Sequence, residues 1–239
     1  MKTILYFLIT ITAGIAFNSC TVTNTMYLNN PEPRGRGNAD FYAGIGTGMQ
    51  VKLDSVFDQG YYKTSYKTTV APSVSLGGQF GVTNRCDVRV SIHLPYIIGG
   101  FGVHAGVQNS FFDAASCFNM ALGIDAGGVL SKKTIHNDNP SEDVNLNPPT
   151  KGALNADVFM PISYKISDNA SIILTPRYSF NTLYVRSVED KTDKRHFNLS
   201  FPVLTLGVKI HHLFLEASGQ YYNNLLRPQI GVAWVWSID

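Results

Sequence analysis

The side chains of this sequence best suited to chemistry occupy alternate positions between residues 86 and 94. Asp87, Arg89, Ser91 and His93 alternate there with Cys, Val, Val, Ile and Leu. A two-residue alternation is the period of a β-strand with one polar and one apolar face. Such a polar face can bind a polar solute, transfer protons or pair its own charges. Because it holds no Lys or Glu, an enclosed interior is favoured over a surface in bulk water.

The same alternation recurs about ten times from Asp40 onward. It predicts an all-β fold, an antiparallel up-and-down transmembrane β-barrel of about ten strands (8–12), with apolar faces toward lipid and polar faces toward the lumen. The strands are expected at 40–51, 70–83, 86–94, 101–111, 117–130, 152–164, 171–186, 197–210, 213–221 and 228–236. Within 197–210 the apolar positions change phase beside Pro202, which predicts a β-bulge.

Side chains alternate between the two faces of each strand, and this alternation predicts that a set of ionisable residues faces the lumen. They are Asp87, Arg89, His93, His104, Asp125, Asp157, Arg177 and Glu216. One interpretation is a plug of paired charges that stiffens the wall, because unpaired buried charges are costly. The other is a narrow polar pore or a small-ligand pocket.

Composition narrows the class of protein. Charged residues make up 15% of the chain, against about 25% in soluble domains. Aromatic residues make up 12%, there are 21 glycines, and the net charge is only +2. No nucleic-acid partner is therefore expected, and no His–Cys pair has metal-site spacing, so we expect neither a metal nor a cofactor. Cys86 and Cys117 fall on opposite strand faces and are expected to be free thiols.

The N-terminal residues have a different character. Residues 1–19 have a short basic start and an apolar core, as in a secretory signal peptide. The sequence Phe-Asn-Ser-Cys at residues 17–20 resembles a bacterial lipobox, which implies that Cys20 becomes a lipid-modified N-terminus. Residues 20–39 contain Pro and Gly without periodicity and are interpreted as a periplasmic tether, ahead of a barrel over 40–239.

The lengths of the connections support the barrel. Short turns alternate with mostly longer polar connections at 52–69, 95–100, 131–151, 187–196 and 222–227. Outer-membrane barrels have short periplasmic turns and longer extracellular loops. An even number of strands then puts both barrel ends, and the N-terminus, on the periplasmic side.

Two stretches carry a family resemblance: GVTNRCDVRVSIHLP from Gly81 and VHAGVQNSFFDAASCFNMALGI from Val103. They resemble uncharacterised Gram-negative outer-membrane barrel families, one associated with aromatic-compound degradation and others with small OmpA-like barrels. The resemblance implies an outer-membrane location, outer-membrane lipid as a partner and, in one group, uptake of apolar solutes.

We therefore expect a lipid-anchored outer-membrane barrel with a structural or surface role, or with passive passage of a small solute. One alternative is a lipid-tethered, soluble lipocalin-like barrel whose apolar faces surround a ligand. The other is a lipid-modifying barrel enzyme that uses Ser91, His93 and His104. Since no local motif joins these residues, no catalytic residue is assigned and we expect no enzymatic activity.

Overall fold

The computed structural model describes residues 20–24, 29–58, 61–95, 100–131, 150–186, 194–222 and 224–238. These residues contain twelve antiparallel β-strands. They are β1 Cys20–Asn24, β2 Ala39–Asp58, β3 Tyr61–Gly81, β4 Cys86–Pro95, β5 Gly100–Ser110, β6 Phe118–Ser131, β7 Thr150–Phe159, β8 Ile162–Ser167, β9 Ala170–Arg186, β10 Lys194–Ile210, β11 Leu213–Tyr222 and β12 Leu225–Ile238. No helix within these ranges is long and apolar enough to cross a membrane.

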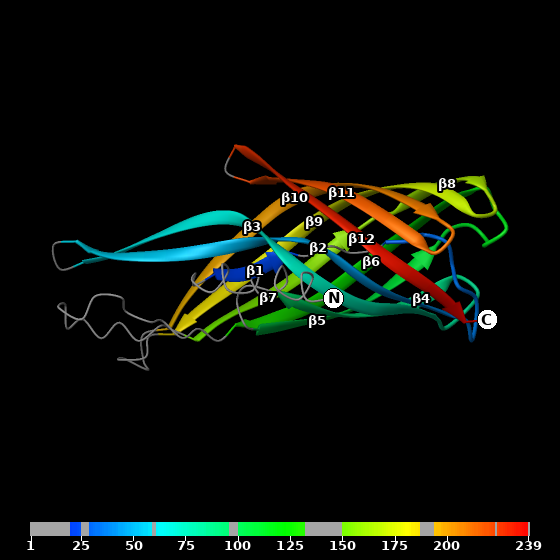
Figure 1. The fold of residues 1–239 in the computed structure, drawn as a ribbon. Helices are drawn as coiled ribbons and strands as arrows, with labels where there is room; N and C mark the ends of the chain where they lie inside the picture. Colours follow the sequence, from blue (N-terminus) through cyan, green and yellow to red (C-terminus); the bar gives the residue numbers. More distant parts are fainter. Residues whose placement is uncertain are drawn as a thin grey trace, which may run out of the picture.

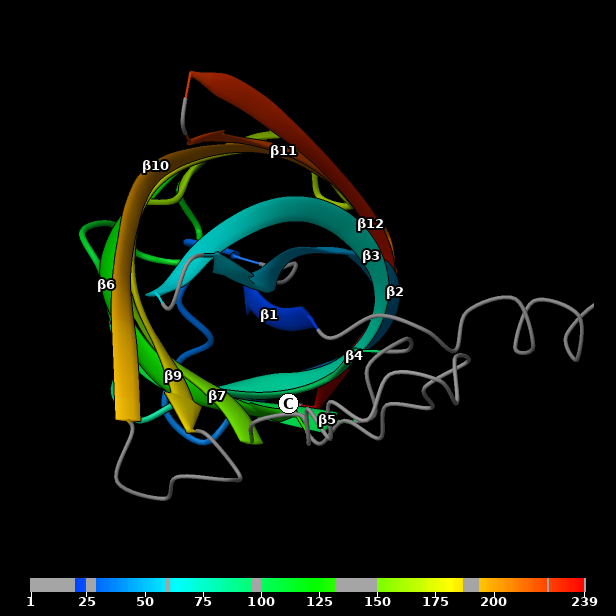
Figure 2. The same cartoon turned by 90° about the vertical axis from the view of Figure 1, so that its left-hand side faces the viewer.

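The strands from β2 to β12 close into a barrel (Figure 2). The closure is made by β12, which pairs with β2 from Ile238↔Ala39 to Gly231↔Gly46. β7 and β8 share one strand position in the barrel wall, because both pair with β6 and β9 in the same register on either side of Met160 and Pro161. Across the described ranges the barrel wall therefore has ten strand positions, as the alternation predicted.

The two ends of the barrel differ. We call one the short-turn end, because residues 82–85, 111–117, 168–169 and 211–212 connect strands there. Ala39 and Ile238 also lie at this end, which is on the right in Figure 1. We call the opposite end the long-loop end.

The β2–β3 hairpin is longer than the sequence predicted. Residues 52–69 were expected to form a polar connection, but β2 and β3 stay paired as far as Asp58↔Tyr61. The hairpin extends past the other strands at the long-loop end (Figure 1). The prediction was wrong because these strands continue to bond each other after they leave the wall.

Burial alternates with the opposite polarity to that of a soluble barrel. On β9, Leu174 and Phe180 are 41% and 50% exposed on the outside, whereas Thr175 is 1% exposed on the inside. Apolar outside and polar inside is the pattern of transmembrane barrels. The lipocalin-like alternative needs the reverse polarity and is contradicted.

The predicted bulge in β10 is absent. β10 pairs with β9 in unbroken register from Lys194↔Arg186 to Ile210↔Ala170. Leu199 and Phe201, which precede Pro202, point inward because they join an apolar cluster inside the barrel. The cluster contains Ala153, Leu183, Leu199, Phe201 and Val203, with Tyr222 packed against it.

Candidate functional site

The polar interior of the barrel is the candidate site. The structure places every predicted lumen-facing ionisable residue inside, each at most 6% exposed. These residues are Asp87, Arg89, His93, His104, Asp125, Asp157, Arg177 and Glu216. Whether they line a solute path stays a prediction.

The two histidines form one cluster on neighbouring strands. Ser75 Oγ lies 2.9 Å from His93 Nδ1, and Ser91 Oγ lies 2.9 Å from His93 Nε2. The rings of His93 and His104 meet edge to face with centroids 5.0 Å apart. His104 Nδ1 lies 3.6 Å from a carboxylate oxygen of Asp125 on β6. The sequence predicted the faces of these residues but not their contacts.

This cluster has part of the geometry that a hydrolase needs. Ser91 and His93 are within hydrogen-bond reach, as a nucleophile and its base must be. However, Ser75 rather than a carboxylate occupies the other ring nitrogen, and His93 has no exposed surface. The lipid-modifying alternative therefore stays a prediction.

Further contacts involve inward-facing side chains of β4, β7 and β9. Ser179 donates to the carboxylate of Asp157, and the amides of Asn155 and Asn181 bond each other. The guanidinium of Arg89 lies 5.0 Å from the ring centroid of Phe159, a cation–π contact. The Arg89–Phe159 contact joins β4 to β7 inside the barrel, whereas the other two contacts link register partners on β7 and β9.

A second set of contacts comes from the segment before β2. Residues 29–34 lie inside the barrel at its short-turn end, and we call them the plug segment. Asn29 accepts a hydrogen bond from Arg89, and the Asn30 carbonyl accepts one of 2.7 Å from Gln108 Nε2. Ser110 Oγ donates to the Pro31 carbonyl at 2.7 Å. Wall residues thus satisfy the backbone of a segment that has no regular structure.

Ion pairs anchor Glu32 and Arg34 of the plug segment. Glu32 pairs with Lys165 at 2.5 Å, and Arg34 pairs with Asp40 at 2.8 Å. The backbone N–H of Arg34 also donates to the carboxylate of Asp87, which accepts a second bond of 2.6 Å from Gln79 Nε2. Asp87, which was predicted to line the lumen, therefore binds the plug segment.

The residues that follow the plug segment form backbone hydrogen bonds with the end of β3. Gly37 N donates to Gly81 O at 3.0 Å, and Gly81 N donates to Asn38 O at 2.9 Å. A Cβ atom on Gly81 would lie 1.7 Å from the carbonyl oxygen of Gly35. Only glycine at position 81 permits this approach.

Residues 20–39 are thus not a free tether in the parts that the structure describes. Asn29 and Asn30 are 4% and 8% exposed, and β1 pairs with β2. The prediction was wrong because it rested on missing periodicity, whereas the plug segment is held by residues about 50–80 positions away in sequence. The sequence offered one signal for the plug segment, which was the large number of predicted lumen-facing polar side chains that need hydrogen-bond partners.

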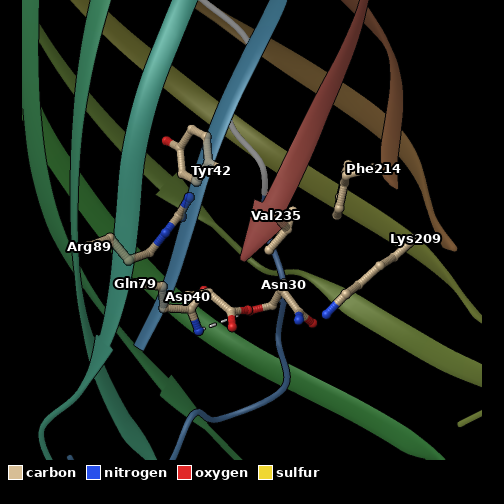
Figure 3. Close-up of a pocket in the computed structure, with 8 residues that line it drawn as sticks. All are labelled: Asn30, Asp40, Tyr42, Gln79, Arg89, Lys209, Phe214 and Val235. Atoms are coloured by element: carbon tan, nitrogen blue, oxygen red, sulfur yellow. Dashed lines mark hydrogen bonds between the residues drawn. The ribbon is translucent and has the colours of Figure 1, made fainter. Parts of the chain in front are cut away.

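The space left beside the plug segment is small. A cavity of about 20 Å³ lies between the plug segment and the walls, which is room for about one water molecule. In Figure 3, Gln79 bonds the Asn30 carbonyl at 3.5 Å, and Lys209 extends toward Asn30. The lining residues are Asn30, Asp40, Tyr42, Gln79, Arg89, Lys209, Phe214 and Val235.

Within the described ranges, no group of three or more His, Cys, Asp or Glu residues is arranged to hold a metal ion. Cys86 and Cys117 are free.

No family model and no curated protein matches this chain. Among solved structures, the attachment invasion locus protein Ail of Yersinia pestis matches 84% of this chain and 96% of its own, at 10% identity and a TM-score of 0.32. The toluene transporter TodX of Pseudomonas putida matches 92% of this chain and 76% of its own, at 12% identity and a TM-score of 0.34. Matches at these values carry no weight for function, so the fold rests on the strand pairings and the burial pattern.

Proposed function

We propose that this chain is an outer-membrane β-barrel that its own plug segment keeps closed, with a structural or surface role. The observation that carries the proposal is a belt of exposed apolar side chains around the barrel. Every strand position in the barrel wall contributes to this belt, for example through Ile45, Leu76, Ile92, Val103, Ile124, Val158, Leu174, Leu206, Leu215 and Ile230. Soluble monomers rarely expose a continuous apolar surface of this extent.

Aromatic residues support the same placement. At the short-turn end, exposed rings gather outside the wall, including Phe41 against Phe80 and Phe112 against Phe118. Trp236 pairs with Phe41 across β12 and β2. Aromatic girdles mark the two interfaces of barrels in the outer membrane. We assign the short-turn end to the periplasm and the long-loop end to the cell exterior.

The plug segment favours a closed barrel over an open pore. Its carbonyls and charges bond Gln108, Ser110 and Lys165, so it occupies the lumen at the short-turn end. Passage of a small polar solute is the second candidate function, favoured by the polar lining, and it requires the plug segment to move. No catalytic role is proposed.

Gel mobility tests the membrane barrel. Carbonate-washed envelopes are dissolved in SDS, and one half is boiled. A barrel in the membrane resists carbonate extraction and migrates differently before and after boiling, because its closed sheet survives SDS. Release by carbonate with no mobility shift would contradict the proposal.

Lipidation of Cys20 belongs to the proposal as well, since two signals anchor a protein more firmly than one. The wild-type protein should incorporate radiolabelled palmitate, and Cys20→Ser should not. Cys117→Ser is the matched control and should be labelled like the wild type. Equal labelling of Cys20→Ser would disprove lipidation at this residue.

A further inference from the structure

We propose that the N-terminal chain is threaded through the barrel, so that Cys20 and any group it carries lie on the outer face of the membrane. This inference rests on the proposed outer-membrane placement and on its orientation. It differs from the usual arrangement in which a tether hangs from the periplasmic rim, and it follows from the position of β1.

The direction of β1 places Cys20 toward the long-loop end. β2 starts at Ala39 at the short-turn end and runs toward the long-loop end. β1 is antiparallel to β2, with Cys20 opposite Lys52 and Asn24 opposite Met49. Cys20 is therefore the residue of β1 that lies furthest toward the long-loop end.

β1 pairs with a part of β2 that lies beyond its pairing with β12. β2 stops pairing with β12 at Gly46, and β3 stops pairing with β4 at Ser73, the partner of Gly46. β1 pairs beyond this level, where the β2–β3 hairpin has left the wall. From Ala39 to Met49 the chain rises about 34 Å along the strand, at about 3.4 Å per residue. With the usual strand tilt this equals about 26 Å along the barrel axis, close to the height of the apolar band of an outer-membrane barrel.

β1 and the plug segment both contact the inside of the barrel. β1 contacts β6, β7 and β9 as well as β2, so it lies within the ring of strands (Figure 2). The plug segment bonds the inner faces of β4 and β5 through Arg89 and Gln108. Both described parts of the N-terminal chain thus lie in the lumen, one at each end of it.

A disulfide test examines the position of β1. The variant Thr21→Cys with Val51→Cys, in a Cys86→Ser, Cys117→Ser background, joins two residues that are register partners. We expect most molecules to cross-link. Thr21→Cys with Ile45→Cys is the matched control and should not cross-link, because Ile45 is 62% exposed on the outer face. Val51→Cys alone accounts for any reaction with Cys20. Absence of the first cross-link would overturn the proposal.

A surface test examines the side on which the chain emerges. An epitope on a Gly/Ser linker is inserted between Cys20 and Thr21, and antibody binding to intact cells is compared with binding after permeabilisation. The same tag within residues 132–149 marks the long-loop end, and the same tag at 211–212 marks the short-turn end.

We expect the N-terminal tag to be accessible on intact cells, like the tag at 132–149, and the tag at 211–212 to be hidden. An N-terminal tag seen only after permeabilisation, with the other two tags as expected, overturns threading and leaves the proposed function intact. A hidden tag at 132–149 together with an accessible tag at 211–212 overturns the orientation itself. Extraction of all the tagged proteins by carbonate overturns the membrane placement.

Discussion

At the scale of single residues, the interior depends on large rings that lie against glycines. A Cβ atom on Gly77 would lie 2.4 Å from the hydroxyl oxygen of Tyr42. A Cβ atom on Gly127 would lie 2.6 Å from the ring of His104 and 2.3 Å from the carbonyl oxygen of Val103. These glycines leave room for the rings of Tyr42 and His104.

Gly127→Ala should therefore lower the thermal stability of the barrel. The added methyl group overlaps His104 and a wall carbonyl, and overpacking of this kind costs about 1–3 kcal/mol. Gly152→Ala is the matched control, because its Cβ atom would meet no atom closer than 3.5 Å. The readout is the temperature at which the fast-migrating gel band disappears. Equal shifts for both variants would show that the His104 site is not tightly packed.

At the scale of elements, the plug segment and its docking site on the end of β3 are the critical pair. Gly81→Ala should undock the plug segment, because its Cβ atom would lie 1.7 Å from a backbone oxygen of Gly35 that no rotamer change can move. The purified variant should be cleaved by trypsin after Arg34 faster than the wild type, while its heat-modifiable mobility persists. Gly152→Ala should be cleaved at the wild-type rate. Unchanged cleavage of Gly81→Ala would mean that this contact does not hold the segment.

The sequence predicted the strands of the wall better than the contents of the lumen. The alternation around Arg89 and His93 identified β4 and its inward face, because period and polarity are local properties of the chain. The inward direction of Phe201 was missed, since apolar residues lie on both faces of β10 there. The plug segment was missed because its partners, such as Gln108 and Lys165, are distant in sequence and the segment itself has no period.

At the scale of the whole molecule, the barrel should not conduct ions while the plug segment is in place. The wild-type protein in planar lipid bilayers should show no steady channels, since the plug segment occupies the lumen at the short-turn end. A variant without residues 20–38 should fold into the same heat-modifiable barrel and open a persistent narrow channel. Gly81→Ala provides a second test without a deletion and should conduct intermittently. Steady wild-type conductance equal to that of the deletion variant would refute the closed barrel.

In the proposed outer-membrane barrel, the outer face of the wall lies in lipid and the inner face does not. Leu204 and Thr205 are adjacent on β10, yet Leu204 is 55% exposed outside and Thr205 is 5% exposed inside. Each is replaced by Cys in a Cys86→Ser, Cys117→Ser background, and the parent protein gives the baseline for Cys20. In native envelopes a lipophilic maleimide should label Leu204→Cys strongly and Thr205→Cys at the baseline level, and a water-soluble maleimide should label neither. Reaction of Leu204→Cys with the water-soluble reagent would place the apolar face in water and contradict the proposed membrane placement.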